Sequence, residues 1–244
     1  MLFRSVGVLA LFDLDHTLLD GDSDVLWCEF LMDCGVLDRA QFEPRNRRME
    51  ADYKAGTVST QAFCEFYVGT LAGRTPAQWQ PLREAFLAQC VLPRLVRAGR
   101  DCIDAHRHAG DEIVLTTATN RFITELTAKA LGIGHLIATE CDIAADGRFS
   151  GAVTGTLNMR DGKVTRLRDW LAAQGRALER EDSVLYSDSI NDLPLLQAVG
   201  RAVAVDPDAR LAAEAAARGW PVLRWRDPGA PGRRRGAASP RAER

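Results

Sequence analysis

The chain has 244 residues, of which 46% are hydrophobic and 26% charged, and its formal net charge is −2. This composition is typical of a folded globular protein, and the length suits one large domain or a domain with an insertion. A net charge so close to zero argues against a general nucleic-acid binder. No apolar run approaches the roughly 20 residues of a membrane-spanning helix. We therefore expect neither nucleic acid nor membrane among its partners.

The cysteines show neither a CxxC pair nor the Cys/His spacing of a zinc site; they are Cys28, Cys34, Cys64, Cys90, Cys102 and Cys141. We expect reduced thiols in a cytoplasmic protein. The amino-terminal MLFRSVGVLALF looks like the start of a signal peptide, but Asp13 and Asp15 interrupt its apolar run and no small-residue cleavage site follows. We therefore expect no secretion.

The first predicted element is a short buried strand, Val8 to Phe12, which ends on Asp13 and Asp15. Because alternate side chains of a strand point the same way, the two carboxylates should lie close together at its carboxyl end. That end of a strand is where open α/β sheets bind ligands. Two neighbouring carboxylates repel each other, so the site favours a bound cation or a shared proton.

The next stretch, residues 21–91, shows helix signals and no convincing strand. Asp22 or Ser23 can cap a first helix, and Pro44 suggests the start of another helix or a kink. Thr75 and Gln78 form a capping-box pattern around a proline at the first helical position. We expect an inserted all-helical cap domain here, with a core made of residues 1–20 and 92–225.

After this insertion, predicted helices and strands alternate, which indicates a doubly wound parallel sheet with right-handed crossovers. Asp146-Gly147 between extended segments predicts a hairpin. The expected helices are 95–108, 121–130, 161–175, 191–200 and 208–219, and the expected strands are 112–120, 135–140, 183–188, 201–205 and 220–225. The tail, residues 226–244, is rich in Arg, Gly, Pro and Ala, and we expect it to be disordered.

Polar residues stand at the ends of three predicted strands: Asp13 with Asp15, Thr116 with Thr117, and Asp188. In a parallel sheet these ends share one edge. Each residue alone has an ordinary structural explanation, as a turn former, a β-former or a helix cap. Together with Lys163, their convergence favours a catalytic site.

These residues stand in four segments: DLDHTLL at 13–19, the strand-end Thr of LTTATN, Lys163 in DGKVTR, and YSDSINDLPLL at 186–196. In order and spacing, the segments resemble the four motifs of the haloacid dehalogenase-like hydrolases. The helical insertion between the first two motifs resembles the cap of the phosphoserine-phosphatase-like branch, subfamily IB. The resemblance implies a Rossmann-like core and a Mg²⁺-dependent phosphatase acting on a small phosphorylated metabolite.

The resemblance also implies roles for individual residues. Asp13 would attack phosphorus to form an aspartyl-phosphate, and Asp15 would protonate the leaving oxygen and then activate water. Mg²⁺ would be held by Asp13, the backbone carbonyl of Asp15, and Asp188. Lys163 would offset charge on Asp13 and the phosphoryl oxygens.

The remaining implied contacts are with the phosphate and its surroundings. Thr117, nearer the turn than Thr116, would donate a hydrogen bond to a phosphoryl oxygen. The supporting groups would be the backbone amides of Leu14 and Ala118 and the side chains of Asn191 and Asp192.

Asp15 favours a phosphatase over a dehalogenase, because attack at carbon needs no general acid at that position. Ion pumps that share the motifs are excluded by the lack of a membrane span. Two alternatives stay open. The first is a phosphotransferase or phosphomutase using the same aspartyl-phosphate. The second is a catalytically silent binding scaffold, although no motif acid is missing.

Residues of the predicted cap also indicate which substrate the protein would bind. In phosphoserine-specific relatives an acid just past the first motif holds the substrate amine, and Asp22 falls at about that place. The arginine that would bind the substrate carboxylate is missing from a stretch that carries Phe66 and Tyr67 instead. An acid with aromatics suits a cationic or ring-bearing leaving group such as histidinol phosphate, and a phosphoserine-like compound is the other candidate. Asn120 is a further substrate candidate, and His16 is expected to have a structural or gating role. The sequence leaves the oligomeric state open.

Overall fold

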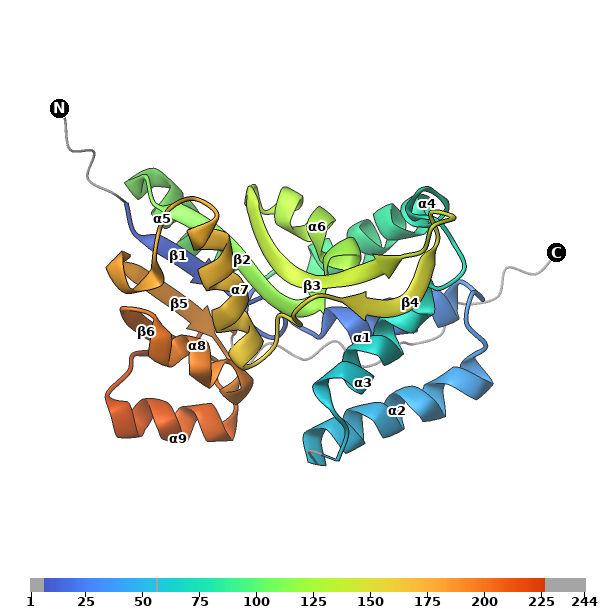
Figure 1. The fold of residues 1–244 in the computed structure, drawn as a ribbon. Helices are drawn as coiled ribbons and strands as arrows, with labels where there is room; N and C mark the ends of the chain where they lie inside the picture. Colours follow the sequence, from blue (N-terminus) through green and yellow to red (C-terminus); the bar gives the residue numbers. More distant parts are fainter. Residues whose placement is uncertain (1–6, 56, 227–244) are drawn as a thin grey trace.

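The computed structural model describes residues 7–55 and 57–226, and its centre is one mixed sheet (Figure 1). The strand order is β4-β3-β2-β1-β5-β6-β7, with β3 and β4 antiparallel and every other neighbouring pair parallel. The strands are β1 Leu9–Phe12, β2 Glu112–Asn120, β3 His135–Ile143, β4 Phe149–Thr154, β5 Ser183–Ser187, β6 Arg201–Val205 and β7 Val222–Leu223. The predicted α/β sheet is confirmed.

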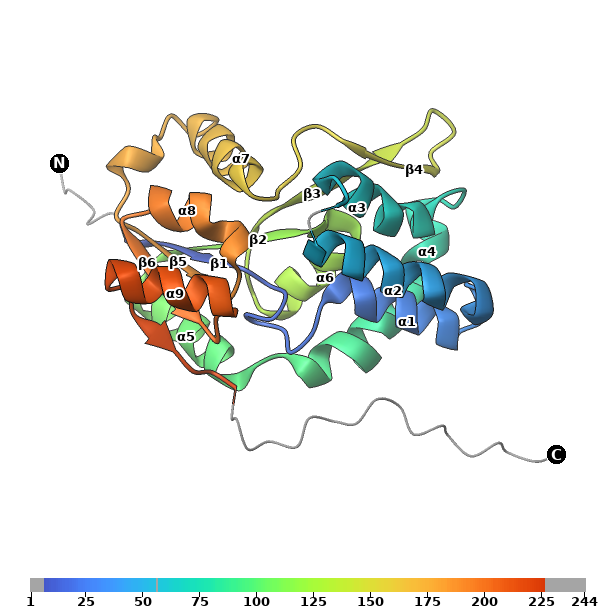
Figure 2. The same cartoon turned by 90° about the horizontal axis from the view of Figure 1, so that it is seen from below.

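Helices cover both faces of this sheet, as Figure 2 shows. They are α5 Arg97–Ala109, α6 Arg121–Ala130, α7 Asp161–Ala172, α8 Leu193–Ala198 and α9 Ala209–Arg218. In β1, Leu9 and Leu11 join the hydrophobic cluster made with α7, α8 and α9, whereas Ala10 and Phe12 join the cluster on the side of α5 and α6. The four residues of β1 are therefore all buried, which explains why the strand is uniformly apolar.

The residues between β1 and β2 are helical, as expected. They form α1 Ser23–Asp33, α2 Arg39–Ala55, α3 Thr60–Val68 and α4 Pro76–Phe86, followed by a π-helical turn at Leu87–Val91. Asp22 caps α1, and the capping box of Thr75 and Gln78 is present at α4. Trp27 of α1 packs against Trp79 and Phe86 of α4, so these helices have an aromatic core. The division into a core and a cap domain stays a prediction.

Several local expectations differ from the structure. α7 ends at Ala172, α8 spans Leu193–Ala198 and β7 spans only Val222–Leu223, so all three are shorter than predicted. α2 begins at Arg39 and continues through Pro44, so a helix start at the proline is wrong, whereas the alternative of a kink there stays a prediction. α5 begins at Arg97 and not at Leu95, because Val96 is extended and its N–H donates to the carbonyl of Leu18. Arg226, the first residue of the predicted tail, is bound to Asp206 and to the carbonyl of His16. The rest of that tail lies outside the described residues.

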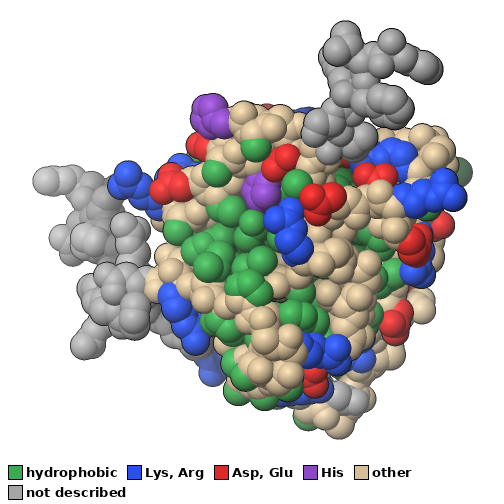
Figure 3. All heavy atoms as spheres, turned by 90° about the vertical axis from the view of Figure 1, so that its left-hand side faces the viewer, with side chains coloured by type: hydrophobic (Ala, Val, Ile, Leu, Met, Phe, Trp, Pro, Cys, Tyr) green, Lys and Arg blue, Asp and Glu red, His purple; other side chains and the backbone are tan. Residues whose placement is uncertain are grey.

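The carboxyl ends of β1 and β5 point toward helices α1–α4 (Figure 1). The opposite side of the molecule, at the amino ends of these strands, carries hydrophobic side chains bordered by charged ones (Figure 3). Polar residues that follow β1 and β5 therefore lie between the sheet and the helical insertion. Among the described helices, none is both long and apolar enough to cross a membrane.

Candidate active site

Asp13 is the first residue after β1, and its carboxylate is paired with Lys163. By strand alternation Asp13 continues the series of Leu9 and Leu11, which faces α7, the helix that carries Lys163. Lys163 Nζ donates to Asp13 Oδ1 at 2.7 Å and to Asp192 Oδ2 at 2.8 Å. All three side chains are buried, so the interaction is screened little by solvent.

Close packing at the start of α7 places Lys163. A Cβ at Gly162 would overlap the carbonyl oxygen of Leu157, so only glycine allows α7 to approach this closely. The carboxamide of Asn158, next in the chain, donates to Thr116 Oγ1 at 3.0 Å and to the carbonyl of Thr117 at 2.9 Å. The segment before α7 is thereby attached to β2.

Thr17 joins the acids at the ends of β1 and β5. Its hydroxyl lies 3.4 Å from Asp13 Oδ2 and 3.1 Å from Asp188 Oδ1, and it also accepts from the Asp188 N–H. Burial raises the pKa of Asp13 to about 7, although Lys163 opposes this effect. Burial and the charge of Asp13 raise the pKa of Asp188 to about 8. The raised pKa values show that Lys163 alone does not fully stabilise the ionised forms of Asp13 and Asp188.

Asp15 is held at the boundary between sheet and insertion. Its Oδ1 accepts from the Ser23 N–H at 2.7 Å, and its Oδ2 accepts from the Thr119 hydroxyl at 2.9 Å. His16, the next residue, is left-handed with φ of 58°, and its N–H donates to the carbonyl of Gly21. This turn leaves the Asp15 carboxylate accessible from the cavity described below.

The second predicted motif places its hydroxyls on opposite sides of β2. Thr116 points to Asn158, whereas Thr117 Oγ1 lies 3.5 Å from Asp15 Oδ2. Thr117 also accepts from the Thr119 N–H at 3.2 Å. Thr117, and not Thr116, therefore lies close to Asp15. This agrees with the choice of Thr117 as the expected donor to a phosphoryl oxygen.

The fourth motif contacts α2. Asn191 Nδ2 donates to the Tyr53 hydroxyl at 3.0 Å, and Asp192 Oδ2 accepts from Ser187 Oγ at 2.7 Å. Tyr53 stacks on Phe63 with ring centroids 4.0 Å apart. The helical insertion therefore touches the loop that follows β5.

A cavity of about 640 Å³ lies over these groups. Its floor includes Asp13, Asp15, Lys163 and Asp188, and acids and aromatic rings of the insertion line the other side: Asp22, Asp24, Glu29, Glu50, Tyr53, Phe63 and Tyr67. No arginine lines it in the described part of the chain. The side toward the insertion therefore offers negative charge and apolar rings.

Burial and the charge of Asp15 raise the pKa of Asp22 to about 7. Burial and the charges of Asp22 and Asp15 raise the pKa of Asp24 well above its usual range. Asp24 Oδ2 lies 3.3 Å from Thr119 Oγ1, whose single proton already serves Asp15. A hydrogen bond between these two groups lowers the pKa of Asp24, but burial and the charges of Asp22 and Asp15 outweigh this effect.

Most predicted site residues line the cavity; these are Asp13, Asp15, Asp22, Tyr67, Ala118, Lys163, Asp188, Asn191 and Asp192. Thr117 is fully buried beneath it. Asn120 caps α6 by accepting from the Ile123 N–H at 3.1 Å, and Leu14 is buried with its carbonyl accepting from Leu18 N–H. Leu14, Thr117 and Asn120 are not among the lining residues.

Sequence reasoning assigned no role to Thr17, Asp24, Glu50, Tyr53 or Thr119. Strand alternation could have identified Thr119, because it shares a face with Thr117. No sequence signal indicates which side of α2 faces the cavity.

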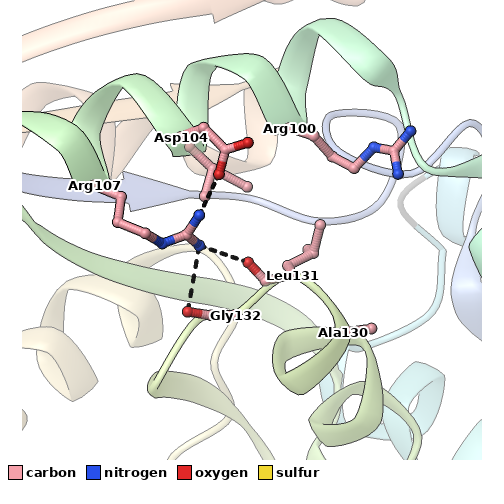
Figure 4. Close-up of a pocket in the computed structure, with 7 residues that line it drawn as sticks. Arg100, Asp104, Arg107, Ala130, Leu131 and Gly132 are labelled. Carbon is pink, nitrogen blue, oxygen red and sulfur yellow. Dashed lines mark hydrogen bonds and ion pairs between the residues drawn. The ribbon is translucent and has the colours of Figure 1, made fainter.

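A second pocket lies between α5 and the turn after α6 (Figure 4). Arg107 extends across it and donates to the carbonyl of Leu131 at 2.8 Å, while pairing with Asp104. The guanidinium thus satisfies a carbonyl at the end of α6, which is a structural role.

Comparisons with known proteins agree with this geometry. A family model described as haloacid dehalogenase-like hydrolase matches residues 10–197. A histidinol-phosphatase of Neisseria meningitidis serogroup C is 38% identical over 219 residues, covering 89% of this chain and 99% of the relative. A Bordetella pertussis protein of unknown function superposes with a TM-score of 0.86 at 42% identity, covering 90% and 99% of the two chains. A substrate-bound phosphoserine phosphatase shares the fold, with a TM-score of 0.65 at 17% identity over 90% and 94%.

Proposed function

This chain belongs to the haloacid dehalogenase-like hydrolases and is a phosphatase, and we propose that it hydrolyses a small phosphate monoester through an aspartyl-phosphate with the help of Mg²⁺. The observation that carries the proposal is the pairing of Asp13 with Lys163, beside Asp15, on the floor of one cavity. A nucleophile and a general acid are thereby both available to one substrate.

In the first step an Asp13 carboxylate oxygen attacks phosphorus and the bond from phosphorus to the ester oxygen breaks. Asp15 gives its proton to that oxygen, so the alcohol leaves neutral. In the second step Asp15 takes a proton from water as the water oxygen attacks phosphorus. The Asp13–phosphorus bond then breaks, which releases phosphate and restores both carboxyl groups. Lys163, already paired with Asp13, would offset charge on the phosphoryl oxygens.

The donor set fits Mg²⁺. Asp13 and Asp188 share the Thr17 hydroxyl, and a bound cation would stabilise their ionised forms, which burial disfavours. Asp13, Asp188 and the Asp15 carbonyl would hold the ion, which would supply charge stabilisation to the phosphoryl oxygens when bound. No cluster of three or more His, Cys, Asp or Glu suited to a metal occurs in the described residues. Two carboxylates and a carbonyl agree with Mg²⁺, which usually keeps several waters.

The cavity favours histidinol phosphate over phosphoserine as substrate. Acids and aromatic rings line its cap side, and no described lining residue is an arginine that would pair with a substrate carboxylate. The name of the Neisseria relative points the same way. We also propose a cytoplasmic location, because all six cysteines are unpaired.

The test is release of phosphate from histidinol phosphate, phosphoserine and p-nitrophenyl phosphate with Mg²⁺. We expect turnover of all three, with the highest kcat/KM for histidinol phosphate. The alternative, a phosphotransferase or mutase, predicts that an added acceptor alcohol captures the phosphoryl group with little net phosphate release. Absence of turnover with every ester would refute the proposed function.

A further inference from the structure

The hydroxyl of Tyr67 has no hydrogen-bond partner among the described residues, although it is buried. Tyr67 is 1% exposed, and it lines the cavity from α3. Its ring is fixed edge-on by Phe63 and Phe66, at centroid distances of 5.0 Å and 5.2 Å. An unpaired buried hydroxyl is costly, so a partner supplied by the ligand would stabilise the site.

The carboxyl groups of Asp22, Asp24 and Glu50 line the same cavity as Tyr67. Burial, followed by the charges of Asp22 and Asp24 and a contribution from Glu50, raises the pKa of Tyr67. Glu50 lines the cavity from α2. Asn46, one turn earlier and on the same helical face, is also buried with its Oδ1 unpartnered within the described chain. The unpaired groups of this region are therefore suited to an N–H donor.

The cationic side chains nearby are engaged elsewhere. Lys163 is paired with Asp13 and Asp192. Arg45 lies 5.8 Å from the centre of the Phe66 ring, and Arg160 lies 5.9 Å from the centre of the Tyr53 ring. Neither arginine lines the cavity. These cations are therefore not available to Glu50, which a cationic ligand can neutralise.

We propose that Glu50 and the Tyr67 hydroxyl form a binding site for a protonated nitrogen of the leaving group. The site selects phosphate esters of cationic amino alcohols and rejects those that carry a carboxylate. This inference rests on the proposed phosphatase function and assigns the specificity to named cap residues. A carboxylate placed here would meet Glu50 without a counter-ion, which costs free energy in a buried site.

The experiment compares kcat/KM for histidinol phosphate, phosphoserine and p-nitrophenyl phosphate in the native protein and in the Tyr67→Phe and Glu50→Gln variants. Glu50→Gln should lower kcat/KM for histidinol phosphate about 10- to 100-fold, mainly through KM, since a hydrogen bond to a charged group is lost. Tyr67→Phe should lower it about three- to tenfold. Both variants should retain turnover of p-nitrophenyl phosphate, because its leaving group carries no cationic nitrogen. Glu43→Gln, on the same helix but paired with Arg47 outside the cavity, is the matched control.

Binding of free histidinol, measured by calorimetry, tests the nitrogen site without turnover. We expect the native protein to bind it and Tyr67→Phe to bind it more weakly. If the native protein hydrolyses no phosphate ester but binds histidinol in this way, the proposed function fails and the nitrogen site stands. If the aryl ester is hydrolysed while phosphoserine is preferred, or if both variants match the native protein, the nitrogen site is refuted. If Glu50→Gln fails to fold, the nitrogen site is tested by Tyr67→Phe and by the substrate preference of the native protein.

Discussion

Lys163 Nζ lies 2.7 Å from Asp13 Oδ1, although the two residues are 150 positions apart in the chain. The same ammonium lies 2.8 Å from Asp192 Oδ2. Burial lowers the pKa of Lys163, but the attraction of Asp13 and Asp192 outweighs burial, so the pKa of Lys163 rises. One buried cation therefore joins the end of β1 to the loop after β5.

Replacing this lysine should destabilise the protein as well as inactivate it. Lys163→Met leaves Asp13 and Asp192 buried without their cation, and we expect the free energy of unfolding to fall by about 3–5 kcal/mol. Urea denaturation measures this change. Lys129→Met, at an exposed lysine of α6, is the control and should change stability little. An unchanged midpoint for Lys163→Met would contradict the importance of the pair.

Asp13→Asn should abolish turnover and leave the fold intact. The amide keeps the shape of the side chain but is no nucleophile, so kcat for p-nitrophenyl phosphate should fall at least about 1,000-fold. Circular dichroism checks the fold, and Asp146→Asn in the exposed hairpin turn is the control. Activity near that of the native protein would remove Asp13 from the role of nucleophile.

Removal of Mg²⁺ with EDTA should stop turnover, and added Mg²⁺ should restore it. Because the ion would stabilise the ionised forms of Asp13 and Asp188, it should also raise the unfolding temperature of the native protein. Asp188→Asn should lose that rise. Turnover that is insensitive to EDTA would rule out the metal site.

Asp22 makes stability depend on pH. Its folded pKa, about 7, lies above its ordinary value of 3.8, so its neutral form is favoured in the folded state. Its contribution is fully present below the unfolded pKa and is lost as pH rises through the folded pKa. Asp22→Asn keeps a side-chain acceptor for the Val25 N–H but cannot ionise.

Thermal unfolding of both proteins across this pH range measures the effect. The unfolding temperature of Asp22→Asn should exceed that of the native protein at about pH 8, and the gap should close at about pH 4. An equal difference in unfolding temperature at both pH values would show that ionisation of Asp22 does not destabilise the folded protein.

Tyr53→Phe isolates the hydrogen bond between α2 and Asn191. The variant loses the 3.0 Å contact with Asn191 and a weaker 3.5 Å contact with Met159 Sδ, and it retains the stacking on Phe63. We expect kcat/KM for histidinol phosphate to fall about three- to tenfold, in line with one hydrogen bond, and stability to change by about 1 kcal/mol or less. Steady-state kinetics and urea denaturation check the two parts. Unaltered kinetics would mean that Asn191 needs no support from α2.

The strands of the core were predictable because each is a short apolar run that ends in a polar turn. Strand β2 occupies the predicted residues, 112–120, and α6 the predicted residues, 121–130. The start of α5 was wrong by two residues, since the long-range hydrogen bond from Val96 to Leu18 holds the preceding backbone extended. Such a bond leaves no local signal in the sequence.

The sequence by itself determined the architecture and the edge of the sheet where the chemistry is expected, because strand period and strand ends are local properties. Only the tertiary structure decided which residues of the insertion face Asp13. Glu50 and Tyr53 line the cavity, whereas Arg45 does not. The polar composition of α2 leaves its orientation undetermined, since the packing of α1 and α3 against it selects the buried face.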